Sequence, residues 1–409
     1  MIITLVIVLV VITIYFFQAV KTVTKRKIIW WAYWTLPLVL IGLLVYYMVR
    51  MATGHSNAIT IKVIYWITGL LLLIILPKLI AFPVLLLEDL WRVFHFGINW
   101  IKSLWGTPKH NYYSEGRRKF ISQFAIGVAL VPFTGLLWGI VKGRYEYKVH
   151  RVTLRFKDLP EAFHGFTIAQ LSDIHAGSFG SAEDVERGVA LANQQKSDVV
   201  LFTGDLVNNF ASEMDVWKQT FSKLKAPYGQ YSVMGNHDYG DYSRWESEQA
   251  RAENLQRVKD VHKEIGFRLL LDENLTIEKE GQYLRLIGVE NWSYEVRHRY
   301  GNLDKALQGV NERDFKILMS HDPSLWDAEV QKHPQHIHLT LSGHTHGMQM
   351  GVEVQGFRWS PAQYMFPQWA GLYEKNKKYI YVNRGFGYIS YPGRVGILPE
   401  ITVITLEKA

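Results

Sequence analysis

The chain has 409 residues, which is long enough for two or three domains. It has no cysteine, so disulfides, thiolate zinc sites and cysteine nucleophiles are excluded, and any metal must bind to His, Asp, Glu, Asn or backbone oxygen. The formal net charge is +8, but residues 1–149 carry 16 basic and 4 acidic side chains, and residues 150–409 carry 29 and 33. A basic excess that flanks apolar segments is typical of a membrane protein, and no nucleic-acid partner is expected.

Four apolar segments in the N-terminal third predict membrane-spanning helices. They cover residues 2–20, 28–49 and 59–77, and the segment that follows Arg117–Ile121 and ends at Val141. Each is close to the ~20 residues that cross the ~30 Å hydrocarbon core of a bilayer. The first segment is too long for a signal peptide and lacks a basic start. None carries a charge near its centre, so the segments predict an anchor and not a transport pathway.

The segment Leu87–Trp105 has a different pattern, with apolar residues at helical spacing on one face and polar residues on the other. It predicts an amphipathic helix that lies in the membrane interface, or one that packs on the other helices; the pattern supports both equally. Residues 1–148 are therefore predicted to be a multi-span membrane anchor of about four transmembrane helices, with an interfacial amphipathic helix.

The basic loops predict an orientation in the membrane. Residues 21–27 and 78–119 are rich in Lys and Arg, which places both loops in the cytoplasm. We therefore expect a multi-pass protein of the cell membrane whose residues 142–409 are extracytoplasmic, although Lys142 and Arg144 oppose this orientation. Arg117 and Arg118 also match a twin-arginine export signal, but the flanking charge of a membrane span is the simpler interpretation.

From residue 149 onward, short apolar strands first alternate with helices and then follow one another. This order predicts a layered α/β domain over residues 149–409. The expected helices cover 182–195, 214–224 and 242–265. The expected strands cover 150–156 (an edge strand), 166–171, 199–203, 231–234, 268–271, 284–289, 316–319, 338–341, 379–382 and 401–406.

Five of these strands end in polar clusters. The clusters are Ser172-Asp173-Ile174-His175, Gly204-Asp205, Gly235-Asn236-His237-Asp238, Ser320-His321-Asp322 and Gly343-His344-Thr345-His346. Ligands of α/β sheets bind at the carboxyl ends of strands, so these clusters predict one convergent site. A turn at Gly343 and Gly347 would let His344 and His346 point toward the same place.

Carboxylate, imidazole and amide ligands without thiolate suit Mn, Zn, Fe or Mg. Seven or eight such residues are too many for one open metal site. They fit two metals ~3.5–4 Å apart that share a carboxylate, an arrangement that serves in-line phosphoryl displacement.

In this order, the Asp-x-His, Gly-Asp, Gly-Asn-His-Asp, His and Gly-His-x-His segments resemble the calcineurin-like metallophosphoesterase family. The downstream segments Asn383–Gly387, Pro392–Arg394 and Leu398–Ile401 are similar to its membrane-associated bacterial branch, which includes UDP-2,3-diacylglucosamine pyrophosphatase-like phosphodiesterases. The resemblance covers about residues 150–409. It implies a four-layer αββα sandwich, here preceded by the all-α transmembrane region.

The resemblance also implies a role for each site residue. Asp205 would bridge two divalent metal ions, His237 would contact a phosphate oxygen and stabilise or protonate the leaving group, and Asp238 would orient the His237 imidazole. Asp322 is a candidate for the same task at His321. The metal ligands would be Asp173, His175 and His346 for the first ion, and Asn236, His321 and His344 for the second.

We therefore predict a membrane-anchored phosphoesterase in which a water that bridges two metals attacks a phosphodiester or pyrophosphate bond. The predicted substrate is a lipid or cell-envelope phosphoester, and no protein partner is predicted. The alternative is a non-catalytic metal-binding interaction or sensor module on the same fold.

For two further groups of residues, the sequence leaves two interpretations open. Arg384 and Arg394 would bind a substrate phosphate or pair with nearby acids. An aromatic segment after the last candidate ligand would form an apolar mouth or membrane-docking rim, or would simply pack on the sheet edge. Its aromatic residues are Phe357, Trp359, Tyr364, Phe366 and Trp369.

Overall fold

The computed structural model describes residues 2–53, 56–105, 114–355 and 357–409. Its chain divides into two compact units. The first contains Met1–Tyr47 and Trp66–Trp138, and the second contains Met48–Tyr65 and Gly139–Ala409. The second unit holds all the candidate site residues and is called the catalytic unit below.

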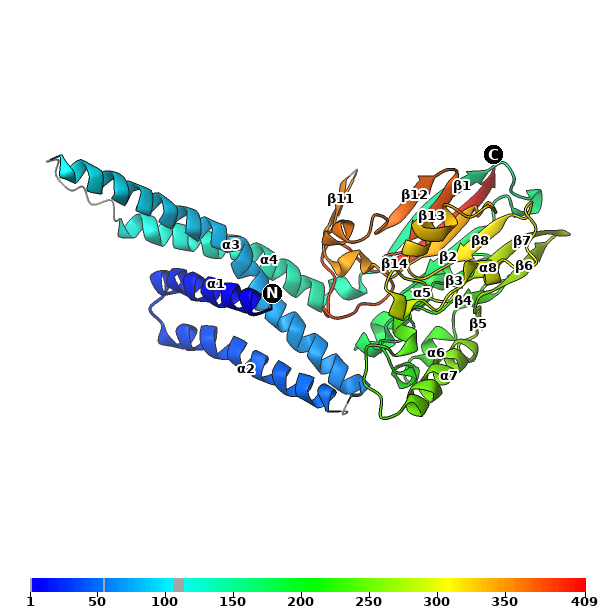
Figure 1. Ribbon diagram of the computed structural model, residues 1–409, viewed down its shortest axis with the longest axis horizontal. Helices are drawn as coiled ribbons and strands as arrows, with labels where there is room; N and C mark the ends of the chain where they lie inside the picture. The colour runs from blue at the N-terminus through cyan, green and yellow to red at the C-terminus, as the bar shows by residue number, and fades with distance from the viewer. Residues whose placement is uncertain (1, 54–55, 106–113, 356) are drawn as a thin grey trace. The chain divides into compact units, whose positions relative to one another are not determined.

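The N-terminal third is helical, as predicted. Its four helices are α1 (Ile2–Val23), α2 (Lys27–Ala52), α3 (Ala58–Leu104) and α4 (Glu115–Val141) (Figure 1). Helices α2, α3 and α4 are long and apolar enough to cross a membrane, and the described part of α1 adds the shorter apolar helix Val8–Val23. The prediction of about four apolar helices is confirmed.

Residues 87–104 are helical, as expected, but they continue α3, which runs without a break for 47 residues. Pro77 and Pro83 lie inside this helix. Neighbouring groups can satisfy the backbone that a proline frees in an apolar helix, so these prolines do not end it. Whether the second half of α3 lies in the membrane interface stays a prediction.

The catalytic unit contains two six-stranded sheets. In the first, β2 to β5 are parallel, β14 is antiparallel to β2, and β1 pairs with β14 at the edge, as predicted for residues 150–156. The strands lie in the order β1 (Lys148–Phe156), β14 (Glu400–Lys408), β2 (Thr167–Leu171), β3 (Val199–Phe202), β4 (Gln230–Ser232) and β5 (Arg268–Leu269).

The second sheet has four parallel central strands between two antiparallel outer strands. Its order is β12 (Gly371–Lys375), β13 (Lys378–Val382), β9 (Leu339–Ser342), β8 (Lys316–Met319), β7 (Gln282–Gly288) and β6 (Glu273–Lys279). A separate two-stranded hairpin consists of β10 (Val352–Val354) and β11 (Phe357–Trp359). Strands β6, β10, β11 and β12 were not predicted.

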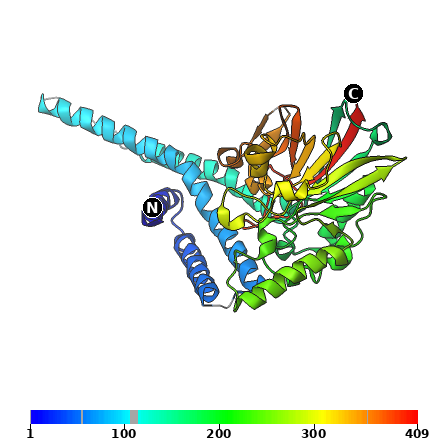
Figure 2. The same ribbon diagram turned by 45° about the vertical axis from the view of Figure 1, so that its right-hand side comes forward.

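The two sheets pack face to face, and helices cover their outer faces (Figures 1 and 2). Apolar side chains such as Ile168, Leu201, Leu286 and Leu341 fill the space between the sheets. Helices α5 (Ala182–Gln194), α6 (Lys218–Phe221) and α7 (Glu248–Glu264) contribute to the core over the first sheet. Helix α8 (Leu303–Ala306) and the π-helix Trp326–Val330 do the same over the second. The predicted four-layer αββα sandwich is confirmed.

Two predicted helices begin later than expected. The helix expected at 242–265 starts at Glu248, where the Ser247 side chain accepts a hydrogen bond from the backbone N–H of Ala250 and caps it. The segment expected to be helical at 214–224 holds only the short helix α6. The residues from 240 to 246 instead form an irregular segment beside the site.

Candidate metal centre

The predicted strand-end clusters meet at one edge of the sandwich. They follow β2, β3 and β4 of the first sheet and β8 and β9 of the second, so both sheets contribute. Within the described residues, these clusters supply two groups of His and Asp with the spacing of a metal site. The first group is Asp173, His175 and His346, and the second is Asp205, His321 and His344.

The first group is buried. Nε2 of His175 lies 3.0 Å from Nε2 of His346, and Nε2 of His346 lies 3.2 Å from Oδ1 of Asp173. Oδ1 of Asp173 is 4.0 Å from Nε2 of His175. Three potential metal-ligand atoms, one from each residue, therefore face a common point.

The second group also includes Asn236. Nε2 of His321 lies 3.1 Å from Oδ2 of Asp205, and Nδ1 of His344 lies 3.3 Å from Nε2 of His321. Oδ1 of Asn236 is 2.9 Å from Nδ1 of His344. The amide Nδ2 of Asn236 donates to the Tyr242 hydroxyl at 2.8 Å, so the amide oxygen is the atom that faces the group.

Asp205 lies between the two groups. Its Oδ2 is 3.1 Å from Nε2 of His321 and 3.4 Å from Nε2 of His175. One carboxylate oxygen is therefore within reach of both groups, which is the position that a bridging ligand requires.

The donor set fits divalent cations. Neighbouring ligands of a cation bound at about 2.1 Å lie about 3 Å apart when they subtend a right angle, which matches the separations within both groups except the 4.0 Å between Asp173 and His175. Carboxylate, imidazole and amide donors suit the cations named from the sequence. The two groups are thus candidate sites for divalent metals.

Burial and neighbouring charges shift the pKa values of most of these candidate metal ligands. Burial would raise the pKa of Asp173 and Asp205, but nearby imidazoles hold both pKa values well below the usual range. Burial lowers the pKa of His175 and of His346, so both imidazoles are neutral at pH 7. Burial would also lower the pKa of His321, but the charge and hydrogen bond of Asp205 raise it to about 10. Cation binding at neutral pH therefore requires His321 to release a proton.

The backbone is strained where the candidate ligands lie. Five of them have a left-handed φ: Asp173 (53°), His175 (47°), Asp205 (61°), His344 (72°) and His346 (51°). Such a conformation costs a non-glycine residue roughly 1–3 kcal/mol and persists only where the surroundings enforce it. Five strained residues lie together here. This strain indicates a functional site independently of the argument from ligand residue types.

The two glycines of the His344–His346 turn act in different ways. Gly347 has a φ of 52°, which favours glycine, as the predicted turn requires. Gly343 instead lets the backbone at position 343 lie close to the Asp173 carboxylate, because a Cβ atom there would be only 2.2 Å from Oδ2 of Asp173.

His237 lies beside the candidate ligands, and the backbone fixes its tautomer. Its Nδ1–H donates to the carbonyl oxygen of Asn208 at 2.8 Å, which leaves Nε2 with the lone pair. The ring stacks on Tyr242, with centroids 4.4 Å apart, and meets the His175 ring edge-on at 5.0 Å. Burial lowers the pKa of His237.

Asp238 does not orient this imidazole, and that expectation is wrong. Its carboxylate accepts hydrogen bonds from four backbone N–H groups, at distances of 2.8 to 3.2 Å. These belong to Asp205, Leu206, Val207 and Gly235. Buried backbone donors need acceptors, and this carboxylate supplies them for the segments after β3 and β4.

Asp322 does not orient His321 either. Its Oδ1 accepts from the backbone N–H of Ser324 at 2.8 Å, and its Oδ2 lies 3.6 Å from Nε2 of His344. The partner of His321 is the carbonyl oxygen of Thr203, which accepts from Nδ1–H at 2.7 Å.

The two arginines differ. Arg384 is buried and pairs with Glu400 and with Glu353, each at 2.6 Å, which agrees with the interpretation that it pairs with acids. Arg394 is fully buried, donates through Nη2 to the carbonyl oxygen of Gly387 at 2.6 Å, and lies 3.0 Å from Nδ1 of His346. It therefore contacts His346 through Nδ1, the ring nitrogen that does not face His175 and Asp173.

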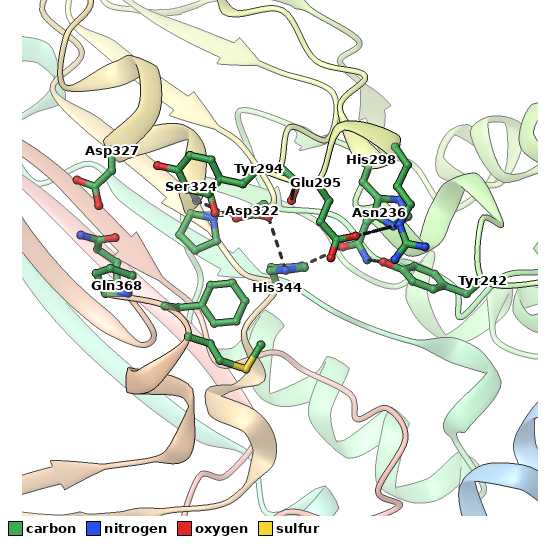
Figure 3. A pocket seen from close by; sticks show the side chains of 16 residues that line it. Asn236, Tyr242, Tyr294, Glu295, His298, Asp322, Ser324, Asp327, His344 and Gln368 are labelled. Carbon is green, nitrogen blue, oxygen red and sulfur yellow. Dashed lines mark hydrogen bonds and ion pairs between the residues drawn. The ribbon is translucent and has the colours of Figure 1, made fainter. Parts of the chain in front are cut away.

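A cavity of about 450 Å³ opens on the second group. Figure 3 shows His344 in this cavity between Asn236 and Asp322, with Tyr242 and Glu295 nearby. Met365, Phe366 and Pro367 line another part of its wall. Tyr242 and the Asn208 carbonyl were not assigned to the site from the sequence, because no motif carries them.

The fold and the site define a metal-dependent hydrolase. The family model described as Calcineurin-like phosphoesterase matches residues 166–348, and the one described as Probable Calcineurin-like phosphoesterase, transmembrane domain matches residues 1–144. The chain belongs to the calcineurin-like metallophosphoesterase family.

Known relatives share this description. The chain is 30% identical over 265 residues to the uncharacterized metallophosphoesterase YkuE of Bacillus subtilis, covering 63% of this chain and 84% of YkuE. It is 29% identical to a zebrafish (Danio rerio) transmembrane protein with metallophosphoesterase domain, over 67% of this chain and 60% of that protein. It is 26% identical to the phosphodiesterase YaeI of Escherichia coli, over 71% of this chain and 98% of YaeI.

Proposed function

We propose that the chain is a membrane-anchored dinuclear-metal phosphoesterase that hydrolyses a phosphodiester or pyrophosphate bond. The observation that carries the proposal is the position of Asp205 Oδ2 within 3.4 Å of an imidazole nitrogen of each group. A single metal site would not need a carboxylate shared in this way. The relative named as a phosphodiesterase, YaeI, supports the same type of reaction.

Each proposed ion has its own ligands beside the shared Asp205. Asp173, His175 and His346 would hold the first, and Asn236, His321 and His344 the second. When bound, the two ions, of Mn, Zn, Fe or Mg, would supply positive charge that lowers the pKa of water and offsets charge on the phosphoryl oxygens.

His237 is the proposed catalytic residue of the protein itself. Because its Nδ1–H is held by Asn208, Nε2 is the atom available to a phosphate oxygen or to the leaving group. Stacking on Tyr242, which lines the cavity, fixes the plane of the His237 ring. A proton that reaches Nε2 would be transferred to the leaving oxygen as the ester bond breaks.

The proposed substrate is a lipid or cell-envelope phosphoester. Two features of the cavity support it: an apolar wall of Met365, Phe366 and Pro367, and polar side chains such as Glu295 and Asp327 that suit a hydrated group. The apolar helices keep the catalytic unit attached to a membrane. The positive-inside rule supports an extracytoplasmic catalytic unit, and protease digestion of intact cells tests it, because a cytoplasmic unit would be protected.

Asp205→Asn tests the reaction. Asparagine keeps the size of the side chain but cannot bridge two cations as a charged carboxylate does, so we expect loss of bound metal and of bis-p-nitrophenyl phosphate hydrolysis. The matched control is Asp215→Asn, because Asp215 is exposed and forms a surface ion pair with Lys218. Metal-dependent turnover that survives in Asp205→Asn contradicts the proposal.

A further inference from the structure

The hairpin of β10 and β11 has an apolar outer face. Val352 pairs with Trp359 and Val354 with Phe357, so these four side chains share one face. All four are exposed, by 45%, 38%, 60% and 56% respectively. A two-stranded hairpin has no hydrophobic core of its own, so these four apolar side chains stay exposed unless another surface covers them.

The opposite face of the hairpin is fastened to the catalytic unit. Glu353 forms an ion pair of 2.6 Å with the buried Arg384. Arg358 donates to the carbonyl oxygen of Ala370 at 2.6 Å, and its guanidinium lies 5.7 Å from the centre of the Trp369 ring. These contacts tie the polar face to the catalytic unit, although Glu353 and Arg358 stay exposed, and they leave the apolar face pointing to the surroundings.

Two more exposed residues extend this surface. Tyr364 is 76% exposed and Met365 is 63% exposed, and Nε1 of Trp359 donates to the Tyr364 hydroxyl at 3.5 Å. Together they form what we call the apolar hairpin face: Val352, Val354, Phe357, Trp359, Tyr364 and Met365. Apolar groups gathered in this way on a soluble domain mark a contact with a protein or a membrane.

The base of the hairpin is joined to the end of a candidate membrane span. The backbone N–H of Gly351 donates to Val395 at 2.9 Å, and the N–H of Arg394 donates to Gly139 at 3.2 Å. Gly139 is in the last turn of α4 and belongs to the catalytic unit. A Cβ atom on Gly139 would lie 2.6 Å from Cγ2 of Val395, so the span end and the hairpin base share one packed segment.

We propose that the apolar hairpin face inserts into the interfacial layer of the lipid bilayer and gives the catalytic unit a membrane contact besides the helices. A membrane surface lies where a span ends, and the hairpin base is fixed to that end. Trp and Tyr prefer this layer because each has an apolar ring and a polar tip. The inference does not depend on which bond the site hydrolyses.

This contact would also bring the lipid surface to the cavity. Met365 belongs to the apolar hairpin face and lines the cavity with its neighbour Phe366. The Phe366 ring meets the His344 imidazole edge-on at 5.4 Å. The surface therefore leads from the bilayer to the second candidate metal group.

Site-directed spin labelling of the full chain tests the insertion. The chain has no cysteine, so Val354→Cys and Phe357→Cys each give a single labelled position, and Glu278→Cys on an exposed part of β6 is the control. The proteins are placed in phosphatidylcholine–phosphatidylglycerol vesicles. We expect labels at 354 and 357 to collide more with oxygen than with a water-soluble nickel chelate, at a depth of about 5–10 Å. The label at 278 should favour the nickel chelate.

Equal nickel accessibility at positions 354, 357 and 278 would overturn the proposal. Spin–spin broadening at 354 without a gain in oxygen collisions would place a second copy of the chain on this face, and would overturn it too. The thermal midpoint, followed by circular dichroism, checks that each labelled chain is folded. If a hairpin variant does not fold, Tyr364→Cys gives the same readout. Label depth is independent of turnover, so failure of the proposed reaction leaves this test intact.

Discussion

The backbone N–H of His237 donates a hydrogen bond to Oδ1 of Asp205 across 2.9 Å. The other oxygen of this carboxylate, Oδ2, faces the imidazoles of His175 and His321. The segment that carries the proposed catalytic imidazole therefore also sets the angle of the proposed bridging ligand. Because the backbone makes this contact, a change of the His237 side chain leaves it in place.

His237→Ala should consequently separate catalysis from metal binding. We expect turnover to fall by roughly 10²–10⁴-fold, the usual contribution of general acid–base catalysis, while the metal content stays at the level of the parent chain. Steady-state kinetics and elemental analysis measure the two effects. The loss should be larger for an alkyl ester than for a p-nitrophenyl ester, whose leaving group needs no proton. Equal losses for both esters would contradict a role in leaving-group protonation.

Asp238→Asn should act on the fold of the site and not on the His237 imidazole. The carboxylate accepts from four backbone N–H groups, and an amide would turn its own NH₂ toward some of these donors. Leaving buried donors unsatisfied costs about 1–3 kcal/mol each, so we expect a lower thermal midpoint and weaker metal binding. Asp215→Asn is the exposed control. An unchanged thermal midpoint with an altered pH–rate profile would return Asp238 to the role of orienting His237.

Tyr242→Phe tests how Asn236 is oriented. The Tyr242 hydroxyl accepts from Nδ2 of Asn236 at 2.8 Å, which directs the amide oxygen toward the second group. Loss of such a supporting contact typically lowers metal affinity 10–100-fold. We expect titration calorimetry to show a decrease of this size for one of two ions, and no decrease for Tyr294→Phe, which changes another exposed tyrosine of the same cavity. Equal weakening of both ions would exclude the assignment of Asn236 to the second ion alone.

The sequence predicts the position of the site well, for a physical reason. Each cluster directly follows a short apolar strand, and parallel strands bring their carboxyl ends to one edge of a sheet. Asp173, Asp205 and His321 can be placed in this way without knowing the order of the strands. The helix expected at 182–195 follows from the spacing of its apolar residues, whereas α8 and the π-helix Trp326–Val330 over the second sheet were not predicted.

The partners of Asp238 and Asp322 could not be predicted in this way. Each lies next to a histidine in the sequence, but successive side chains in a tight turn point apart, and the buried backbone amides nearby compete for the same carboxylate. Tyr242 was expected in a helix because residues 242–265 were interpreted as one mainly polar helix. That helix begins only after the Ser247 cap, which leaves Tyr242 free to stack on His237.

Glu213 should make stability depend on pH. Burial raises the pKa of Glu213 from its ordinary value of 4.5 to about 7, although the carboxylate accepts backbone hydrogen bonds from Asn208, Asn209 and Phe210. Between about pH 4.5 and 7 the folded chain keeps this proton and the unfolded chain has lost it, so stability falls as the pH rises through this window. Below it, both states are protonated and the contribution is constant.

The variant Glu213→Gln removes this titration. We expect the thermal midpoint of the parent chain, measured relative to that of Glu213→Gln, to decrease between about pH 4.5 and 7 and to level off above it. Glu248→Gln is the control, because Glu248 is exposed. A relative midpoint that rises with pH would mean that the backbone donors outweigh burial and that Glu213 is ionised in the folded chain.

Gly343→Ala tests whether the turn between His344 and His346 sets both metal sites. A Cβ atom at position 343 would lie 1.8 Å from the Ser172 hydroxyl and 2.2 Å from Oδ2 of Asp173, so the strand ends of β2 and β9 must move apart. This displacement would move Asp173 in the first group and His344, the next residue in the chain, in the second. We expect both ions to be lost together, with a loss of turnover. Gly180→Ala is the matched control, since a Cβ atom there meets nothing within 4 Å. Elemental analysis that finds only one ion missing in Gly343→Ala would show that the turn serves one site and that the other is positioned independently.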